Sequence, residues 1–169
     1  LKQFSRADSG DKEWVDVNEC VSTTLKVVNN KLKYHCNIKN NLGDIPKAWI
    51  NFGKISQVLT NLLINAGQAI NEHGQITITT KLQNNNIVIS VEDNGLGISP
   101  DNLNKIFDPF FTTKDVGIGT GLGLSISYGI VQEHGGNLTA TSTLNKGSCF
   151  SITLPIGNDC EQVKEIVND

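Results

Sequence analysis

The sequence predicts an α+β fold in which a mixed β-sheet packs against a layer of helices. Apolar residues recur at helical spacing over residues 51–71, and alternating strand patterns occupy residues 75–82, 87–92, 137–143 and 148–155. The chain has 169 residues, of which 38% are hydrophobic. That length and composition suit one packed core rather than two.

The N-terminal third predicts short elements. Residues 1–8 are typical of the end of a helix, and residues 9–11 interrupt it. Residues 14–17 alternate like a strand, and Asn18 is then expected to cap a helix that runs to about residue 31. Strand-like stretches follow near residues 32–38 and 48–50.

The remaining two thirds predict longer elements. Gly74 ends the helix of residues 51–71, and three asparagines at 84–86 indicate a hairpin between the next two strands. Residues 93–121 have no steady period, which is typical of a functional lid. A helix over residues 122–134 precedes the last strands, and the acidic tail 157–169 is expected to fray. We therefore expect one domain over residues 11–156.

Composition limits the possible functions. The net charge is −3, from 14 basic and 17 acidic residues, which argues against nonspecific binding of nucleic acid. No apolar run approaches the roughly 18 residues of a membrane span. The four cysteines are scattered, which fits a reducing, cytoplasmic setting without disulfides or a metal cluster. The absence of Met predicts that the chain is part of a longer protein.

Polar residues form a stripe on the central helix, beside its apolar face: Lys54, Asn61, Asn65 and Glu72. An amide oxygen such as that of Asn65 can ligate Mg²⁺ and leave the charge of the metal available to phosphate oxygens. A solvated helix face is the alternative interpretation.

Asp93 stands where a strand gives way to a turn that contains Gly95 and Gly97 and leads to Ile98. A buried carboxylate accepts hydrogen bonds, so it would favour the exocyclic amino group of adenine over the carbonyl of guanine. The glycines would let the backbone approach a ligand closely. An ordinary Asp-Asn-Gly turn is the alternative.

Alternating glycines at residues 117–123 lead directly into a helix, and free N–H groups at a helix start favour anions. The spacing matches neither a dinucleotide fingerprint nor a Walker loop. Before this run, Lys114 follows three phenylalanines, Phe107, Phe110 and Phe111. The aromatic cluster predicts either a docking surface or a small core under the lid.

Together these segments resemble the catalytic, ATP-binding domain of sensor histidine kinases, a branch of the GHKL (Bergerat-fold) ATPases. The resemblance covers residues 12–156. Residues 57–66 resemble the N box, 93–97 the first glycine box, 107–111 the F box and 119–124 the second glycine box. Residues 107–114, Phe-Asp-Pro-Phe-Phe-Thr-Thr-Lys, are similar to kinases of the nitrogen-regulation type.

The resemblance implies a two-layer α/β sandwich of about five strands on three helices, with ATP under a flexible lid. Asn65 would ligate Mg²⁺, Asp93 would bind adenine, and Thr153 would support that aspartate. The resemblance assigns the remaining nucleotide contacts to the lid and its flanks: Gly95, Gly97, Ile98, Lys114, Gly119, Thr120, Gly121, Leu122, Gly123 and Leu124.

The resemblance implies that the residue at position 61 decides between phosphoryl transfer and ATP hydrolysis. Hydrolysing relatives carry a glutamate at this position as the general base, whereas this chain has Asn61. An amide cannot accept the proton of water, so we expect phosphoryl transfer. None of the three histidines suits the role of acceptor. The resemblance therefore implies transfer to a histidine on a separate dimerisation domain, docked through the three phenylalanines, and a response regulator as the next partner. A hydrolysing ATPase and a nucleotide-sensing pseudokinase that only docks partners are the alternatives.

Overall fold

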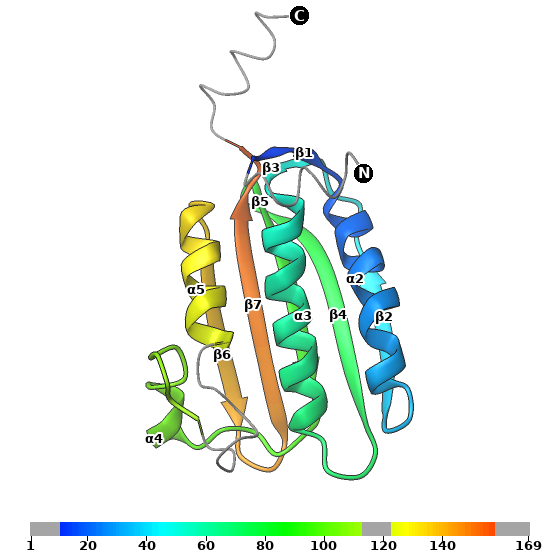
Figure 1. Ribbon diagram of the computed structural model, residues 1–169, viewed down its shortest axis with the longest axis vertical. Coiled ribbons are helices and arrows are strands. Elements are labelled where there is room, and N and C mark those ends of the chain that lie inside the picture. The colour runs from blue at the N-terminus through cyan, green and yellow to red at the C-terminus, as the bar shows by residue number, and fades with distance from the viewer. Residues whose placement is uncertain (1–10, 113–122, 158–169) are drawn as a thin grey trace, which may run out of the picture.

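A computed structural model describes residues 11–112 and 123–157 and shows the expected two layers (Figure 1). A five-stranded sheet has the order β2-β4-β5-β7-β6, and a separate pair joins β1 and β3. The elements in chain order are β1 (Glu13–Val15), α2 (Val17–Leu32), β2 (Cys36–Leu42), β3 (Ala48–Ile50), α3 (Phe52–Gln68), β4 (Gly74–Gln83), β5 (Asn86–Asp93), α4 (Pro100–Leu103), α5 (Gly123–Glu133), β6 (Asn137–Thr143) and β7 (Gly147–Pro155).

The five-stranded sheet is mixed, as predicted. Strands β2 and β4 run parallel, and the pairs β4–β5, β5–β7 and β6–β7 are antiparallel. The predicted hairpin joins β4 to β5, where Asn84 (φ 53°) and Asn85 (φ 63°) take left-handed conformations. Asparagine tolerates that region better than most residues, which explains its use in this two-residue turn.

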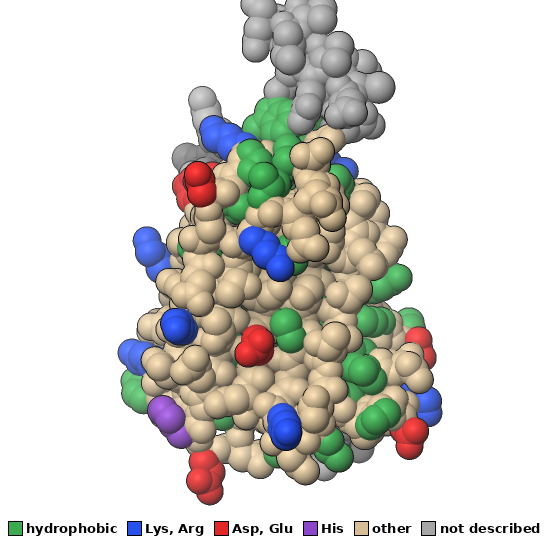
Figure 2. Space-filling view, turned by 180° about the vertical axis from the view of Figure 1, so that it is seen from behind, with side chains coloured by type: hydrophobic (Ala, Val, Ile, Leu, Met, Phe, Trp, Pro, Cys, Tyr) green, Lys and Arg blue, Asp and Glu red, His purple; other side chains and the backbone are tan. Residues whose placement is uncertain are grey.

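The helices α2, α3 and α5 cover one face of the sheet (Figure 1). Inward-facing residues such as Ile89 on β5 and Ile152 on β7 are fully buried, and their neighbours along each strand are half-exposed. No described element covers the opposite, open face, which consists mainly of uncharged polar side chains and backbone, with isolated charges (Figure 2). Among the described residues, no helix is long and apolar enough to cross a membrane.

The start of α2 corrects one prediction. Asp16 is the N-cap, because its carboxylate accepts the backbone N–H of Asn18 at 3.0 Å. Asn18 instead bridges to the sheet: its amide donates to the carbonyl of Gly43 at 2.7 Å and accepts from Thr80 at 2.7 Å. The helix also continues to Leu32, which is buried, so the strand predicted near residues 32–38 begins only at Cys36.

Two further boundaries differ from the predictions. Helix α3 ends at Gln68 rather than near residue 71, because the N–H of Leu96 bonds the carbonyl of Ala69 at 2.9 Å where the chain turns. The short helix α4 was not predicted. Ser99 caps it and Pro100 occupies its first position, a common start for a helix that is too short to show a period.

Candidate functional site

Helix α3 positions Asn61 and Asn65 one turn apart on one side, where both are half-buried. The amide of Asn61 donates to the hydroxyl of Ser127 on α5 at 3.2 Å. Gly123, the first residue of α5, lies so close that a Cβ there would collide with the Asn61 amide. The predicted residues Gly123 and Leu124 therefore start α5 directly beside the polar side of α3.

Asp93 is the last residue of β5 and is only 5% exposed. Burial raises the pKa of its carboxyl above the usual value of 3.8, and backbone hydrogen bonds from Gly95 and Ser148 partly oppose that shift. The bond from the N–H of Gly95 measures 2.9 Å. Of the carboxylates in residues 11–112 and 123–157, Asp93 alone is buried. Such a site favours a ligand that donates a hydrogen bond.

The segment after Asp93 passes between the end of α3 and the β6–β7 hairpin. A Cβ on Gly95 would collide with the carbonyl of Ala69. Gly97 takes a φ of +73°, and a Cβ there would collide with the carbonyl of Thr143. The N–H of Ile98 donates to the hydroxyl of Ser142 at 2.7 Å. These contacts leave little room for side chains, so glycine is required at both positions.

The structure contradicts the expected place of Thr153. Thr153 pairs with Val88 in the sheet, and its side chain lies on the open face with the half-exposed residues of β7. Ser148, which is buried, pairs with Asp93. Because strand residues alternate between faces, a position five residues along the strand also faces the opposite way.

Ser142 and Ser148 were missed by the sequence analysis. Their hydroxyl oxygens lie 2.9 Å apart, and that of Ser142 donates to the carbonyl of Gly147 at 3.0 Å. Through the Ile98 contact, this pair joins the segment after β5 to the hairpin. Only the pairing of β5 with β7, which places Ser148 opposite Asp93, reveals that Ser148 lies near the aspartate.

The three phenylalanines have different environments. The ring of Phe107 lies 5.3 Å from that of Tyr128 and 6.4 Å, edge to face, from that of Phe150. Phe111 also packs against the core, whereas Phe110 is 72% exposed with a φ of +67°. The cluster thus forms a small core and leaves Phe110 as its exposed aromatic side chain.

Five predicted nucleotide contacts lie outside the residues that the structure describes: Lys114, Gly119, Thr120, Gly121 and Leu122.

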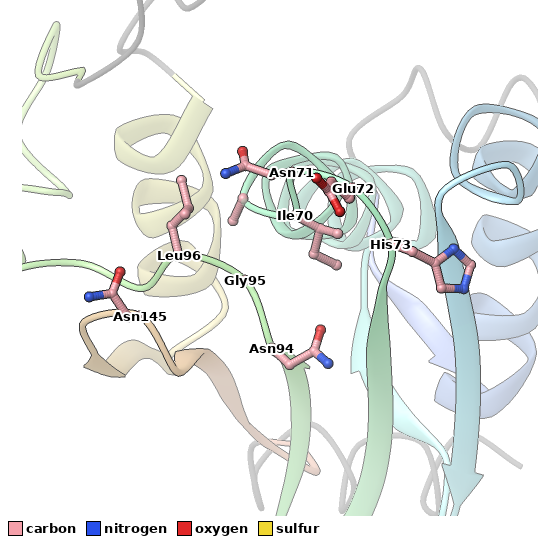
Figure 3. A pocket seen from close by; sticks show the side chains of 9 residues that line it. Ile70, Asn71, Glu72, His73, Asn94, Gly95, Leu96 and Asn145 are labelled. Carbon is pink, nitrogen blue, oxygen red and sulfur yellow. The ribbon is translucent and has the colours of Figure 1, made fainter.

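A recess of about 330 Å³ lies beside this region, and Gly95 is the predicted site residue that lines it. Figure 3 shows Asn71 and Glu72 after the end of α3, Asn94, Gly95 and Leu96 after β5, and Asn145 on the hairpin.

The described part of the chain has no group of three or more His, Cys, Asp or Glu side chains that could hold a metal. The amide oxygen of Asn65 by itself would fit Mg²⁺, which usually takes few protein ligands and keeps several waters.

Comparison with known families agrees with this geometry. Residues 51–158 match the model of the histidine kinase-, DNA gyrase B-, and HSP90-like ATPases. The chain belongs to this ATPase family. Members bind ATP, so the buried Asp93 and the two asparagines of α3 lie in an ATP-binding domain.

Individual members are sensor kinases. The sensor histidine kinase ZraS of Escherichia coli K12 is 39% identical over 84% of this chain, and the signal transduction histidine-protein kinase AtoS of the same strain is 38% identical over 92%. The chain spans only 30% of ZraS and 26% of AtoS. In both cases the match covers a minor part of the relative.

Solved structures of the family have the same fold. The nucleotide-free catalytic domain of histidine kinase ThkA matches with a TM-score of 0.79 and 31% identity, over 88% of this chain and 99% of that domain. ThkA has also been solved in complex with the response regulator protein TrrA; that structure matches with a TM-score of 0.74 and 28% identity, over 86% of this chain and 42% of ThkA.

Proposed function

We propose that this domain binds ATP·Mg²⁺ and donates the γ-phosphoryl group to a histidine on a separate helical dimerisation domain, as the catalytic part of a two-component sensor kinase. Asn61 carries the proposal. It stands where a hydrolysing relative needs a general base, and its amide already donates to Ser127. A neutral amide in that place cannot take the proton of an attacking water.

The roles of the other residues follow from their chemistry. Asp93 accepts the exocyclic amino group of adenine, while the backbone of Gly95 and Gly97 allows close approach. Asn65 ligates the Mg²⁺, which supplies charge neutralisation for the triphosphate. Lys114 and residues 119–124 contact the phosphates in this proposal, with Gly123 and Leu124 at the start of α5.

The partners are part of the same proposal. Exposed Phe110 docks the dimerisation domain, and Phe107 and Phe111 support its loop from the core side. A receiver domain of a response regulator then takes the phosphoryl group; the ThkA–TrrA complex supports such a pairing by similarity. The Phe-Asp-Pro-Phe-Phe-Thr-Thr-Lys run supports a kinase of the nitrogen-regulation type, and the use of ATP fits a cytoplasmic domain.

The test is calorimetric titration with ATP and GTP, with and without Mg²⁺, followed by incubation with γ-labelled ATP and a histidine-bearing dimerisation domain. We expect ATP to bind at least 100-fold more tightly than GTP, because guanine presents a carbonyl to Asp93. Label should move to the added histidine and leave this chain unlabelled. Robust ATP turnover without an acceptor would favour a hydrolysing ATPase, and binding without transfer or turnover would favour a nucleotide-sensing module.

A further inference from the structure

The interface between α3 and α5 contains a buried polar contact that the proposed function does not use. Ser127 is 2% exposed, and its hydroxyl accepts the amide of Asn61 at 3.2 Å. Ser127 lies one helical turn after Gly123, so both residues meet Asn61 from the same side of α5. The first turn of α5 is therefore held against α3 through the side chain of Asn61.

The far end of α5 has its own attachments. The Nε2 atom of His134 accepts the backbone N–H of Asn51 at 3.1 Å, and Lys54 pairs with Glu133 at 3.2 Å. A change at Ser127 would leave these contacts in place, so α5 would stay docked at its C-terminal end while its first turn loosened.

We propose that Ser127 is a positioning residue: by binding Asn61, it fixes the first turn of α5 relative to Asn65. This inference rests on the proposed function. ATP·Mg²⁺ must span two elements, with its metal at Asn65 on α3 and its phosphates near Gly123 on α5. Adenine is bound elsewhere, at Asp93 on β5, so Ser127 affects the metal–phosphate end of the nucleotide and not the base.

Loss of the hydroxyl has a defined physical effect. Ser127→Ala removes the acceptor of a half-buried amide and lets the Asn61 side chain rotate away from α5. One neutral hydrogen bond corresponds to about a three- to tenfold change in a binding constant. We expect a loss of that size in affinity for ATP·Mg²⁺, with the affinity for adenosine unchanged.

The experiment compares two ligands and one matched control. ATP·Mg²⁺ is titrated by calorimetry and adenosine by NMR, into wild type, Ser127→Ala and Ser127→Cys. Cysteine keeps the shape of serine but is slightly larger and is a weaker hydrogen-bond acceptor. Thr24→Val is the control. Thr24 lies on α2, away from α5, and its buried hydroxyl is 2.8 Å from the hydroxyl of Ser56 on α3. Removing it should lower thermal stability without changing either affinity.

A double variant shows whether Ser127 acts through Asn61. Adding Ser127→Ala to Asn61→Ala should cause no further loss of ATP·Mg²⁺ affinity. The inference is overturned if adenosine and ATP·Mg²⁺ weaken equally, if neither Ser127 variant affects ATP·Mg²⁺, or if the two substitutions are additive. A wild-type domain that binds no ATP·Mg²⁺ would overturn the proposed function itself, which separates the two failures.

Discussion

Asp93, the last residue of β5, and His134, just after α5, are both buried ionisable residues, and their pKa values shift in opposite directions. Burial raises the pKa of Asp93 and lowers the pKa of His134, because in each case it disfavours the charged form. Asp93 sits where a ligand donor is proposed to bind. His134 is satisfied within the protein, between the carbonyl of Ile130 and the N–H of Asn51.

Replacing Asp93 with asparagine tests the proposed adenine contact. Asp93→Asn keeps the shape of the side chain but presents an NH₂ group or a weaker acceptor to adenine. We expect ATP affinity to fall at least about tenfold, the loss of one charged hydrogen bond. Calorimetry measures it, with Glu92→Gln as the control, since Glu92 is the exposed neighbour on the open face. Equal ATP affinity in Asp93→Asn and wild type would contradict the assignment.

His134 should make stability depend on pH. Its pKa in the folded state is lowered from 6.5, chiefly by burial; Lys12 and Lys54 lower it further, while the carbonyl of Ile130 and Glu133 raise it. The unfolded state then binds the proton first, so stability is full above pH 6.5 and is lost as the pH falls toward the folded pKa. The slope is at most about 1.4 kcal/mol per pH unit.

Urea unfolding between pH 7.5 and 5 measures this slope. His134→Asn removes the titrating group, and the contribution of Asp93, which has the opposite sign, is the same in both proteins. The difference between the two curves should therefore shrink as the pH falls. A constant difference would show that His134 does not titrate in this range.

At the scale of elements, local patterns predicted most of the fold. The i, i+3, i+4 spacing of α3 and the alternation of β5 and β7 directly reflect burial on one face, so both could be found from the sequence. The choice of Asp16 over Asn18 as a cap could not, because both residues can cap a helix and only the contact of Asn18 with Gly43 decides between them.

The site divides in the same way. Asn61, Asn65, Asp93 and the glycines around them lie within short motifs that can be found in the sequence. The contacts of Ser127 with Asn61 and of Ser148 with Asp93 join distant parts of the chain and cannot. The resemblance pointed to Thr153, but periodicity does not fix which residues of two strands pair, and the sheet places Ser148 opposite Asp93. Register depends on the β6–β7 hairpin and on β5 together.

Two glycine-to-alanine substitutions test whether position 97 requires glycine. Gly97→Ala places a Cβ at a φ of +73° against the backbone of Thr143, and should destabilise the domain by about 1–3 kcal/mol. Gly129→Ala, inside α5, meets nothing within 4 Å and should stabilise it by about 0.5–1 kcal/mol. Chemical denaturation of both variants gives the comparison. Equal effects of the two substitutions would refute the requirement for glycine at 97.

For the whole molecule, the decisive feature is that helices cover one face of the sheet and leave the other open (Figures 1 and 2). The hydrophobic core lies between the sheet and α2, α3 and α5. Stability should therefore depend strongly on which face of a strand is changed.

Adjacent residues of β7 test this asymmetry. Ile152 is fully buried and Ser151 is half-exposed on the open face. Ile152→Ala should lower the free energy of unfolding by about 2–5 kcal/mol, because it leaves a cavity. Ser151→Ala should lower it by no more than about 1.5 kcal/mol, because it removes only the hydrogen bond between the hydroxyls of Ser151 and Ser90 at 3.1 Å. Urea denaturation at constant m-value measures both. A large loss from Ser151→Ala would indicate that something packs on the open face.

The pairing of β5 with β7 has a consequence for the evolution of this domain. The register between the two strands buries Phe150, Ile152 and Leu154 and also places Ser148 opposite Asp93. A slip of a single residue would turn the whole apolar row outward at the same moment that it removed Ser148 from the aspartate. A shift of this register by one residue is thus expected to cost the domain both its apolar packing and the pairing of Ser148 with Asp93, so it should be selected against on two counts.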